Sequence, residues 1–240
     1  MQILIDAGLL LASYLFGAIP FGLIIVKLMT GKDVRTVESG RTGGTNVARA
    51  AGWVAGLLTA ILDVLKAAAT VWLSKAVTGN EWVHVLAPIA AILGHNYSVF
   101  LAERDARGRW RLRGGAGGAA SLGGALGLWA PSVLIILPIG ALIYYFVGYA
   151  SVTTMSVAFL AAIIFAVRAL FYHAPWEYVL YSVLAEILLI LALLPNIKRL
   201  LNGTERLHGW RAKRLTTNAP RQQKPVEKSR SRSVKQENAG

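Results

Sequence analysis

Residues 37–49 read Val37-Glu38-Ser39-Gly40-Arg41-Thr42-Gly43-Gly44-Thr45-Asn46-Val47-Ala48-Arg49, a polar segment set between two long apolar runs. Its glycines allow backbone N–H groups to converge on a ligand, and its hydroxyl, amide and guanidinium groups add further donors. A ligand with several acceptor oxygens and negative charge, such as a phosphate, suits these donors best. The alternative is a basic loop at a membrane surface that binds nothing.

The chain as a whole is too apolar for a water-soluble protein of this size. Of its 240 residues, 55% are hydrophobic, and the mean hydropathy is +0.52. A spanning helix needs roughly 20 apolar residues. We therefore predict an all-α integral membrane protein with seven transmembrane helices, at about residues 3–29 (bent near Pro20), 47–77, 82–101, 122–129, 131–147, 151–167 and 175–194.

The distribution of charge predicts the orientation. From Asn196 onward the chain has 12 Lys and Arg residues but only 3 Asp and Glu, and basic segments stay in the cytoplasm. Seven spans then place the N-terminus outside; it has no basic residue before its apolar run and is not typical of a cleaved signal peptide. We expect a membrane domain (1–195), a juxtamembrane segment (196–210) and a basic, disordered cytoplasmic tail (211–240). The tail's expected partner is the anionic inner leaflet, with no nucleic acid.

Two ionisable residues, Asp63 and Lys66, stand one helical turn apart in the second predicted span. Ionisable groups are costly in a bilayer and face protein or a wet cavity. We expect a structural ion pair, with direct participation in chemistry as the alternative. The chain has no cysteine, which excludes disulfides and a cysteine nucleophile. We expect no metal and no cofactor.

Two further polar segments follow. Five arginines, Arg104, Arg107, Arg109, Arg111 and Arg113, lead into Gly114-Gly115-Ala116-Gly117-Gly118-Ala119-Ala120-Ser121. Small residues also permit close helix packing in membranes, and we expect that role of Gly123 and Gly124. The last segment, directly after the final span, is Asn196-Ile197-Lys198-Arg199-Leu200-Leu201-Asn202-Gly203-Thr204-Glu205. The predicted topology places all three polar segments on the cytoplasmic side, where they can share one site.

With these three segments in order, the chain resembles the bacterial acyl-phosphate:glycerol-3-phosphate acyltransferase family (PlsY type) over about residues 13–205. Residues 33–49 look like the family's first motif, residues 114–117 like its second and residues 196–205 like its third. The resemblance implies an enzyme of the bacterial cell membrane with its active site facing the cytoplasm. It implies acyl transfer from acyl phosphate to the 1-hydroxyl of glycerol 3-phosphate, giving lysophosphatidic acid and phosphate for phospholipid synthesis.

The resemblance also assigns roles to residues. We expect the catalytic residues to be Ser39, Asn46 and Asn196. We expect acyl phosphate to be bound by Gly43, Gly44, Thr45 and Arg49. We expect glycerol 3-phosphate to be bound by Arg41, Arg113, Gly114, Gly115 and Ser151, although Ser151 could instead be a helix N-cap. Arg199 and Glu205 are expected to anchor the start of the tail by hydrogen bonds and ion pairing.

The expected chemistry needs no covalent intermediate, because phosphate is already a good leaving group. Positioning and charge stabilisation could suffice. His95 is either a general base or a structural histidine that holds the loop backbone. We expect a bound phosphate oxygen, or no dedicated base, to take the hydroxyl proton.

The sequence departs from the family pattern in its cationic positions. The lysine of the family's Gly-Gly-Lys-Gly is Ala116 here, and the histidine that often stands three residues before the third-motif asparagine is Leu193. Arg41 replaces an asparagine, and Arg113 replaces the lysine before the glycine pair. We hypothesise that Arg41 and Arg113, with Arg111 as a further candidate, supply the missing positive charge from neighbouring positions.

Three other readings remain. The chain could accept a different phosphorylated alcohol or be inactive. It could be a small transporter with helices broken at Pro20 and the glycine runs, but no internal repeat is visible. A nucleotide-binding P-loop is disfavoured, because the first segment lacks the Gly-Lys-Ser/Thr ending.

Overall fold

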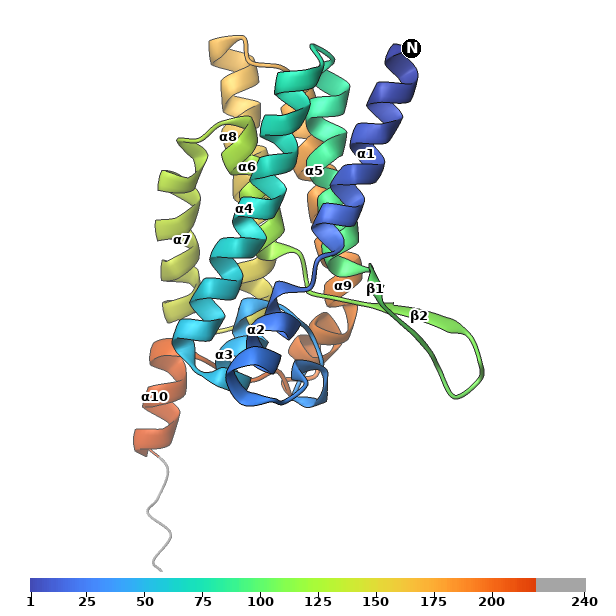
Figure 1. The fold of residues 1–240 in the computed structure, drawn as a ribbon. Helices are drawn as coiled ribbons and strands as arrows, with labels where there is room; N and C mark the ends of the chain where they lie inside the picture. The colour runs from blue at the N-terminus through green and yellow to red at the C-terminus, as the bar shows by residue number, and fades with distance from the viewer. Residues whose placement is uncertain (219–240) are drawn as a thin grey trace, which may run out of the picture.

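The structure is a computed structural model that describes residues 1–218. Within them, seven apolar helices stand side by side (Figure 1): α1 (Gln2–Ala18), α4 (Trp53–Val77), α5 (Glu81–Asn96), α6 (Gly118–Leu128), α7 (Ser132–Phe146), α8 (Ala150–Tyr172) and α9 (Glu177–Leu201). They correspond to the seven predicted segments. In this part of the chain, four stretches are long and apolar enough to cross a membrane: residues 2–30, α4, α8 and α9.

The remaining elements lie at the end of the bundle away from the N-terminus (Figure 1). They are α2 (Phe21–Thr30), the short 3-10 helix η1 (Val34–Thr36), α3 (Gly44–Ala51), the strands β1 (Ser98–Arg104) and β2 (Trp110–Arg113), and α10 (Gly209–Asn218). These elements surround the three polar segments.

Three details differ from the prediction. The end of the third predicted span and the basic loop after it form the β1–β2 hairpin, so the all-α prediction holds for the bundle but not here. Residues 47–77 are divided between α3 and α4 by Gly52, whose φ of 90° favours glycine. Residues 211–218, the start of the predicted tail, are helical and belong to α10. The rest of the predicted tail, residues 219–240, lies outside the described residues.

The first helix is interrupted at Pro20, as expected, because proline has no N–H to continue the hydrogen-bond ladder. α1 ends at Ala18, and the carbonyl of Ile19 accepts a hydrogen bond from Lys66 Nζ at 3.0 Å. Lys66 Nζ also lies 2.7 Å from Asp63 Oδ1, and both side chains are buried. Asp63 and Lys66 therefore neutralise each other inside the bundle. Lys66 also gives a hydrogen-bond partner to the Ile19 carbonyl at the break in the first helix.

Close packing around α6 explains its small residues. A Cβ on Gly123 would lie 2.1 Å from the Val64 carbonyl oxygen of α4, and one on Gly124 would lie 2.2 Å from the Tyr181 hydroxyl of α9. That hydroxyl donates to the Ser121 carbonyl at 2.6 Å in the buried core. The packing role predicted for Gly123 and Gly124 is confirmed.

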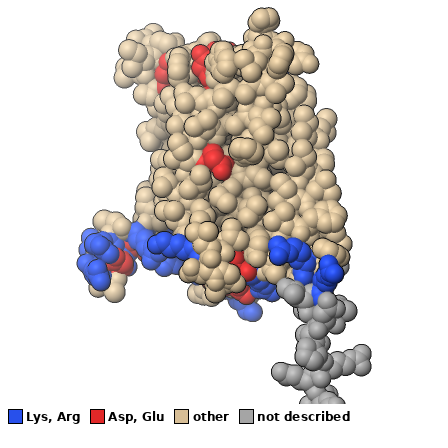
Figure 2. All heavy atoms as spheres, turned by 180° about the vertical axis from the view of Figure 1, so that it is seen from behind, with Lys and Arg blue, Asp and Glu red and all other residues tan. Residues whose placement is uncertain are grey.

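The surface of the molecule is divided along the bundle axis. Figure 2 shows Lys and Arg side chains gathered at the end that carries α2, α3 and the hairpin, below a long, largely uncharged surface with a few acidic residues at mid-height and at the opposite end. Many large apolar side chains on α4, α7, α8 and α9 are exposed on that surface. An apolar belt above a basic end is the pattern of a membrane protein with one positively charged face.

Candidate functional site

A cavity of about 580 Å³ opens at the basic end of the bundle. It lies between the loop before α3, α3 itself, the ends of α4, α5, α6, α8 and α9, and residues 204–208. The predicted site residues that line it are Ser39, Arg41, Gly43, Gly44, Thr45, Asn46, Arg49, Asp63, His95, Ser151, Asn196, Arg199 and Glu205. The three polar segments of the sequence therefore meet in one place.

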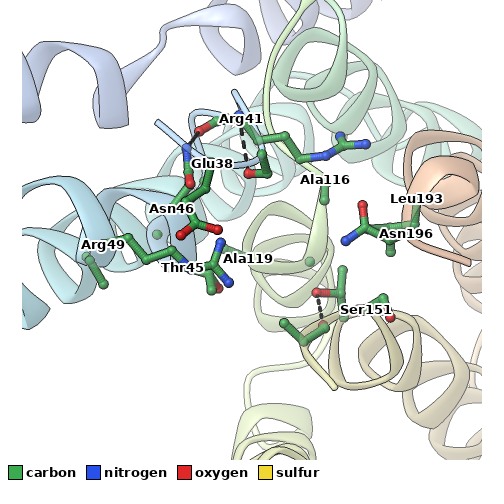
Figure 3. A pocket seen from close by; sticks show the side chains of 18 of the residues that line it. Glu38, Arg41, Thr45, Asn46, Arg49, Ala116, Ala119, Ser151, Leu193 and Asn196 are labelled. Carbon is green, nitrogen blue, oxygen red and sulfur yellow. Dashed lines mark hydrogen bonds between the residues drawn. The ribbon is translucent and has the colours of Figure 1, made fainter. Parts of the chain in front are cut away.

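Arg41 is the central cation of the cavity. Its guanidinium donates from Nη1 to the Gly115 carbonyl at 2.9 Å and from Nη2 to the Ala192 carbonyl. Figure 3 shows the side chain extending towards Ala116 and Leu193. It makes no ion pair with any carboxylate among residues 1–218, and burial lowers the pKa of the guanidinium. A partly buried cation without a counter-ion favours an anionic ligand.

The loop that presents Arg41 is held by Asn46. The buried Asn46 side-chain amide donates to the carbonyls of Val34, Val37 and Arg41 at 2.9–3.1 Å. With both amide hydrogens shared among these carbonyls, Asn46 has no N–H left for a phosphate in this arrangement. Asn46 lines the cavity, and its side-chain amide braces the loop.

The N-terminus of α3 faces the cavity with Gly43, Gly44 and Thr45. The first N–H groups of a helix have no partner within the helix and attract anions. Arg49, in the last turn of α3, also lines the cavity. Its Nη2 lies 3.3 Å from His208 Nε2, and it has no carboxylate partner among the described residues.

Asp63 and His95 also line the cavity, and both side chains are buried. His95 Nδ1 lies 3.4 Å from Asp63 Oδ1, which also contacts Lys66. The His95 carbonyl accepts the Gly115 N–H at 2.9 Å, and a Cβ on Gly115 would lie 1.9 Å from His95 Nε2. His95 therefore supports the second glycine segment by backbone and by ring.

The third segment is organised around Glu205. Its carboxylate accepts hydrogen bonds from Ser151 Oγ at 2.6 Å and from Asn196 Nδ2 at 3.3 Å. Ser151 is not the N-cap of α8; that position is Tyr149, with no side-chain capping bond. Arg199 acts through its backbone, because its carbonyl accepts the N–H groups of Thr204 and Glu205. Its side chain makes no ion pair with Glu205 or any other described carboxylate.

Residues 204–208 cross from α9 to α3 along the cavity. Arg206 pairs with Glu38 at 3.0 Å, and the His208 ring stacks on Tyr144 with centroids 5.4 Å apart. Burial lowers the pKa of His208, and the charge of Arg49 acts in the same direction. Because neutral histidine is favoured here, the segment is docked without adding another charge beside Arg49.

Four of the predicted site residues do not line the cavity, and one of them, Lys66, is paired with Asp63 inside the bundle. Arg113 is paired with Glu103, and Gly114 and Gly115 lie behind the lining, with the Gly114 carbonyl accepting the Thr42 N–H at 3.3 Å. Other lining residues received no predicted role: Glu38, Ala48, Trp53, Gly56, Leu57, Ala60, Gly117, Gly118, Ala119, Ala150, Thr154, Thr204, Arg206 and His208.

One side of the cavity is apolar and reaches the outer surface of α4. Trp53 and Leu57 line it and are 74% and 51% exposed. Ala60 of α4 and Ala119 of α6 continue this lining inward. The cavity therefore combines a cationic, donor-rich part with an apolar part that adjoins the membrane-facing surface.

The fold and the cavity define the class of protein: a helical membrane protein whose cavity, at its basic end, joins a cationic, donor-rich part to an apolar part. Residues 7–203 match the family model described as glycerol-3-phosphate acyltransferase. The chain is 37% identical to the glycerol-3-phosphate acyltransferase of Thermus thermophilus over 203 residues, covering 85% of this chain and 95% of the relative. It is 35% identical to glycerol-3-phosphate acyltransferase 2 of Moorella thermoacetica, covering 85% and 97%.

A solved structure of PlsY, an integral membrane glycerol 3-phosphate acyltransferase in its glycerol 3-phosphate form, superposes with a TM-score of 0.73 at 30% identity. The superposition covers 85% of this chain and 96% of that one. The chain belongs to the glycerol-3-phosphate acyltransferase family.

Proposed function

We propose that the protein transfers a fatty acyl group from acyl phosphate to the 1-hydroxyl of glycerol 3-phosphate. The products are lysophosphatidic acid and inorganic phosphate. Family membership supports the reaction, and so do the two solved PlsY structures described as glycerol 3-phosphate and lysophosphatidic acid forms. The observation that carries the proposal is the Arg41 guanidinium, a partly buried cation that lines the cavity and has no carboxylate partner among the described residues.

The two substrates fit different parts of the cavity. The phosphate of acyl phosphate suits the α3 N-terminus, where Ser39, Gly43, Gly44 and Thr45 supply donors and Arg49 supplies charge. Its acyl chain would extend out of the cavity along the apolar side, past Leu57 and Trp53. Glycerol 3-phosphate suits the opposite side, next to Arg41, Ser151 and Asn196. This arrangement brings the acceptor hydroxyl towards the acyl carbonyl.

In the proposed step, the 1-hydroxyl oxygen attacks the acyl carbonyl carbon and the carbon–oxygen bond to phosphate breaks. The leaving phosphate keeps the electron pair, and one of its oxygens takes the hydroxyl proton. Arg49 and the α3 N-terminus stabilise the charge on the leaving group. We assign His95 and Asn46 to positioning: His95 supports the glycine segment, and Asn46 holds the loop that carries Arg41.

Arg41 gives the departures from the family pattern a physical explanation. Its guanidinium is bonded to the carbonyls of Gly115 and Ala192, the neighbours of Ala116 and Leu193. A cation therefore reaches the space beside both positions, and the two small or apolar side chains leave room for it. Arg113 does not share this role, because it lies outside the cavity and is paired with Glu103.

We further propose seven membrane crossings, with the N-terminus outside and the cavity facing the cytoplasm of a bacterial inner membrane. The gathering of Lys and Arg at the cavity end supports this orientation (Figure 2). Residues 1–195 would form the membrane domain, 196–210 the juxtamembrane segment and 211–240 a basic region at the anionic leaflet.

The test is an assay of purified protein in lipid with acyl phosphate and labelled glycerol 3-phosphate. Lysophosphatidic acid should form with acyl phosphate and not with acyl-CoA, and Arg41→Gln should reduce its formation. Product with another polyol phosphate but not with glycerol 3-phosphate would assign a different acceptor to the same fold. No product with any acceptor would show lost activity.

A further inference from the structure

The β1–β2 hairpin projects sideways from the bundle at its basic end (Figure 1). Its strands are antiparallel, with Glu103 opposite Arg111 and Arg104 opposite Trp110. Side chains alternate between the two faces of a strand. Trp110 and Leu112 therefore share one face with Arg104, and Arg111 shares the other face with Arg113 and Glu103. On β2, Trp110 and Leu112 therefore make one face apolar, whereas Arg111 and Arg113 make the other basic.

Its apolar side chains are left uncovered by the described part of the chain. Trp110 is 67% exposed and Phe100 57%, and Val99 and Leu112 are also exposed. Trp110 contacts the Arg104 guanidinium, 4.9 Å from the ring centroid, which shields only one side of the indole. Large apolar side chains gathered on a short hairpin indicate a contact surface.

The charges of the hairpin are only partly neutralised. Arg113 is paired with Glu103, and Arg109 with Asp105. Arg107 and Arg111 make no ion pair with any described residue, and residues 103–113 carry five Arg against one Asp and one Glu, a net charge of +3. An exposed tryptophan beside unpaired arginines is the composition of a membrane interface, where the ring meets the acyl boundary and the cations meet phosphates.

We propose that this hairpin docks on the headgroups of anionic lipids in the leaflet on the basic side. Trp110 and Leu112 enter the interface, and Arg107 and Arg111 bind lipid phosphate. The position of the hairpin favours a bilayer over a soluble acidic partner. It extends outward at the height where the uncharged surface ends and the basic residues gather, so headgroups surround it (Figures 1 and 2).

The hairpin is connected to the cavity at its base. β2 leads directly into Gly114, whose carbonyl accepts the Thr42 N–H next to Arg41. Glu103 of β1 lies 3.9 Å from Arg35, which is held by Asp33 at 2.7 Å in the same loop. Docking of the hairpin would thus steady the loop that presents Arg41. This consequence for activity rests on the proposed function, whereas docking itself does not.

The absence of cysteine allows docking to be measured with single-cysteine variants. Trp110→Cys and Leu112→Cys would carry an environment-sensitive fluorophore in nanodiscs of phosphatidylcholine, with or without phosphatidylglycerol. Lys32→Cys, in an exposed loop, is the reference for water. Phe159→Cys, 60% exposed on α8, is the reference for lipid.

We expect the hairpin labels to respond to lipid-attached quencher, with emission shifted towards the Phe159 reference when phosphatidylglycerol is present. Each basic residue near an anionic surface adds about 1 kcal/mol. Arg107→Gln with Arg111→Gln should then lower the docked fraction relative to the undocked one by roughly thirtyfold. Hairpin labels that behave like the Lys32 reference in both lipid mixtures would overturn the proposal. The fluorescence of the hairpin labels does not depend on turnover. A negative docking result can therefore be distinguished from a negative acyltransferase assay.

Discussion

Arg41 Nη1 donates to the Gly115 carbonyl at 2.9 Å, which joins two segments separated by 74 residues. The same guanidinium also donates to the Ala192 carbonyl of α9. Neither acceptor carries a full charge, so the cation is positioned without being neutralised. A bound phosphate would be the first group to neutralise it.

Arg41→Gln should raise the KM for glycerol 3-phosphate. A hydrogen bond to a charged group is worth about 1.5–3 kcal/mol, so the increase should be roughly ten- to a hundredfold. Arg113→Gln is the matched control, because this arginine is paired with Glu103 outside the cavity. Its KM should stay near that of the wild type. Steady-state kinetics with saturating acyl phosphate measure both, and an unchanged KM in Arg41→Gln would rule out the role of Arg41.

A lysine at position 116 should preserve activity only if the positive charge of Arg41 is removed. Ala116→Lys alone places a second cation beside Arg41, and like charges in a partly buried site repel. We expect that variant to lose activity and Arg41→Asn with Ala116→Lys to regain a substantial part of it. The double-substitution cycle of kcat/KM checks this. Additive losses in the combined variant would show that the two positions do not share a function.

His95→Gln should lower kcat without changing the shape of the pH–rate profile. A general base contributes about 10²–10⁴ in rate, whereas a support for the Gly115 segment should cost less than about a hundredfold. The measurement is kcat across the pH range for both proteins. Loss of an ionisation from the profile of His95→Gln would instead assign His95 as the base.

Asn46→Ala should loosen the loop that carries Arg41, because three backbone carbonyls lose their donor. Transfer should be abolished, and hydrogen exchange of residues 34–43 should quicken. Asn196→Ala should also abolish transfer but leave exchange in that loop unchanged, because its amide contacts Glu205. Full activity in either variant contradicts its assignment to the site.

Acidification should release residues 204–208. Burial and the charges of Arg49 and Arg206 lower the pKa of His208, with Glu205 and Glu38 acting in the opposite direction. The docked segment therefore binds a proton less readily than the free one, whose histidine has an ordinary pKa of about 6.5. Docking is complete above that pH and weakens as the pH falls below it.

The protection of residues 203–210 against hydrogen exchange, relative to the free chain at the same pH, measures this release at pH 5.5 and 7.5, chosen as roughly one unit either side of that value. His208→Gln should remove most of the difference between the two pH values. An equal difference in wild type and variant would show that another group controls the segment.

The sequence alone predicted the bundle well, because apolar runs and the break at Pro20 are local features. It also identified the three segments that meet at the cavity, since their polar residues stand out against apolar neighbours. The hairpin was missed because residues 98–101 are apolar enough to continue a helix, and the arginines after them suggested an ordinary loop. No local sequence pattern predicts the cross-strand pairing of Arg104 with Trp110.

The role of each single residue was harder to predict than the location of the site. Asn46 was expected to be catalytic, but its side-chain amide donates to three carbonyls that only the folded loop brings within reach. Glu38 lies in the first motif and His208 in none, but neither received a predicted role, because their partners Arg206 and Arg49 are far away in sequence. Arg113 looked equivalent to Arg41 until the hairpin placed Glu103 beside it.

The exposed edge of the cavity at Trp53 and Leu57 bears on how a tailed substrate arrives. An acyl donor dissolved in the bilayer could enter the cavity laterally from the membrane, without first passing into water. Its supply would then depend on its mole fraction among the surrounding lipids, and not on its amount per volume of buffer. Diluting the donor with inert lipid at a fixed total amount should slow turnover, and catalysis would follow two-dimensional encounter.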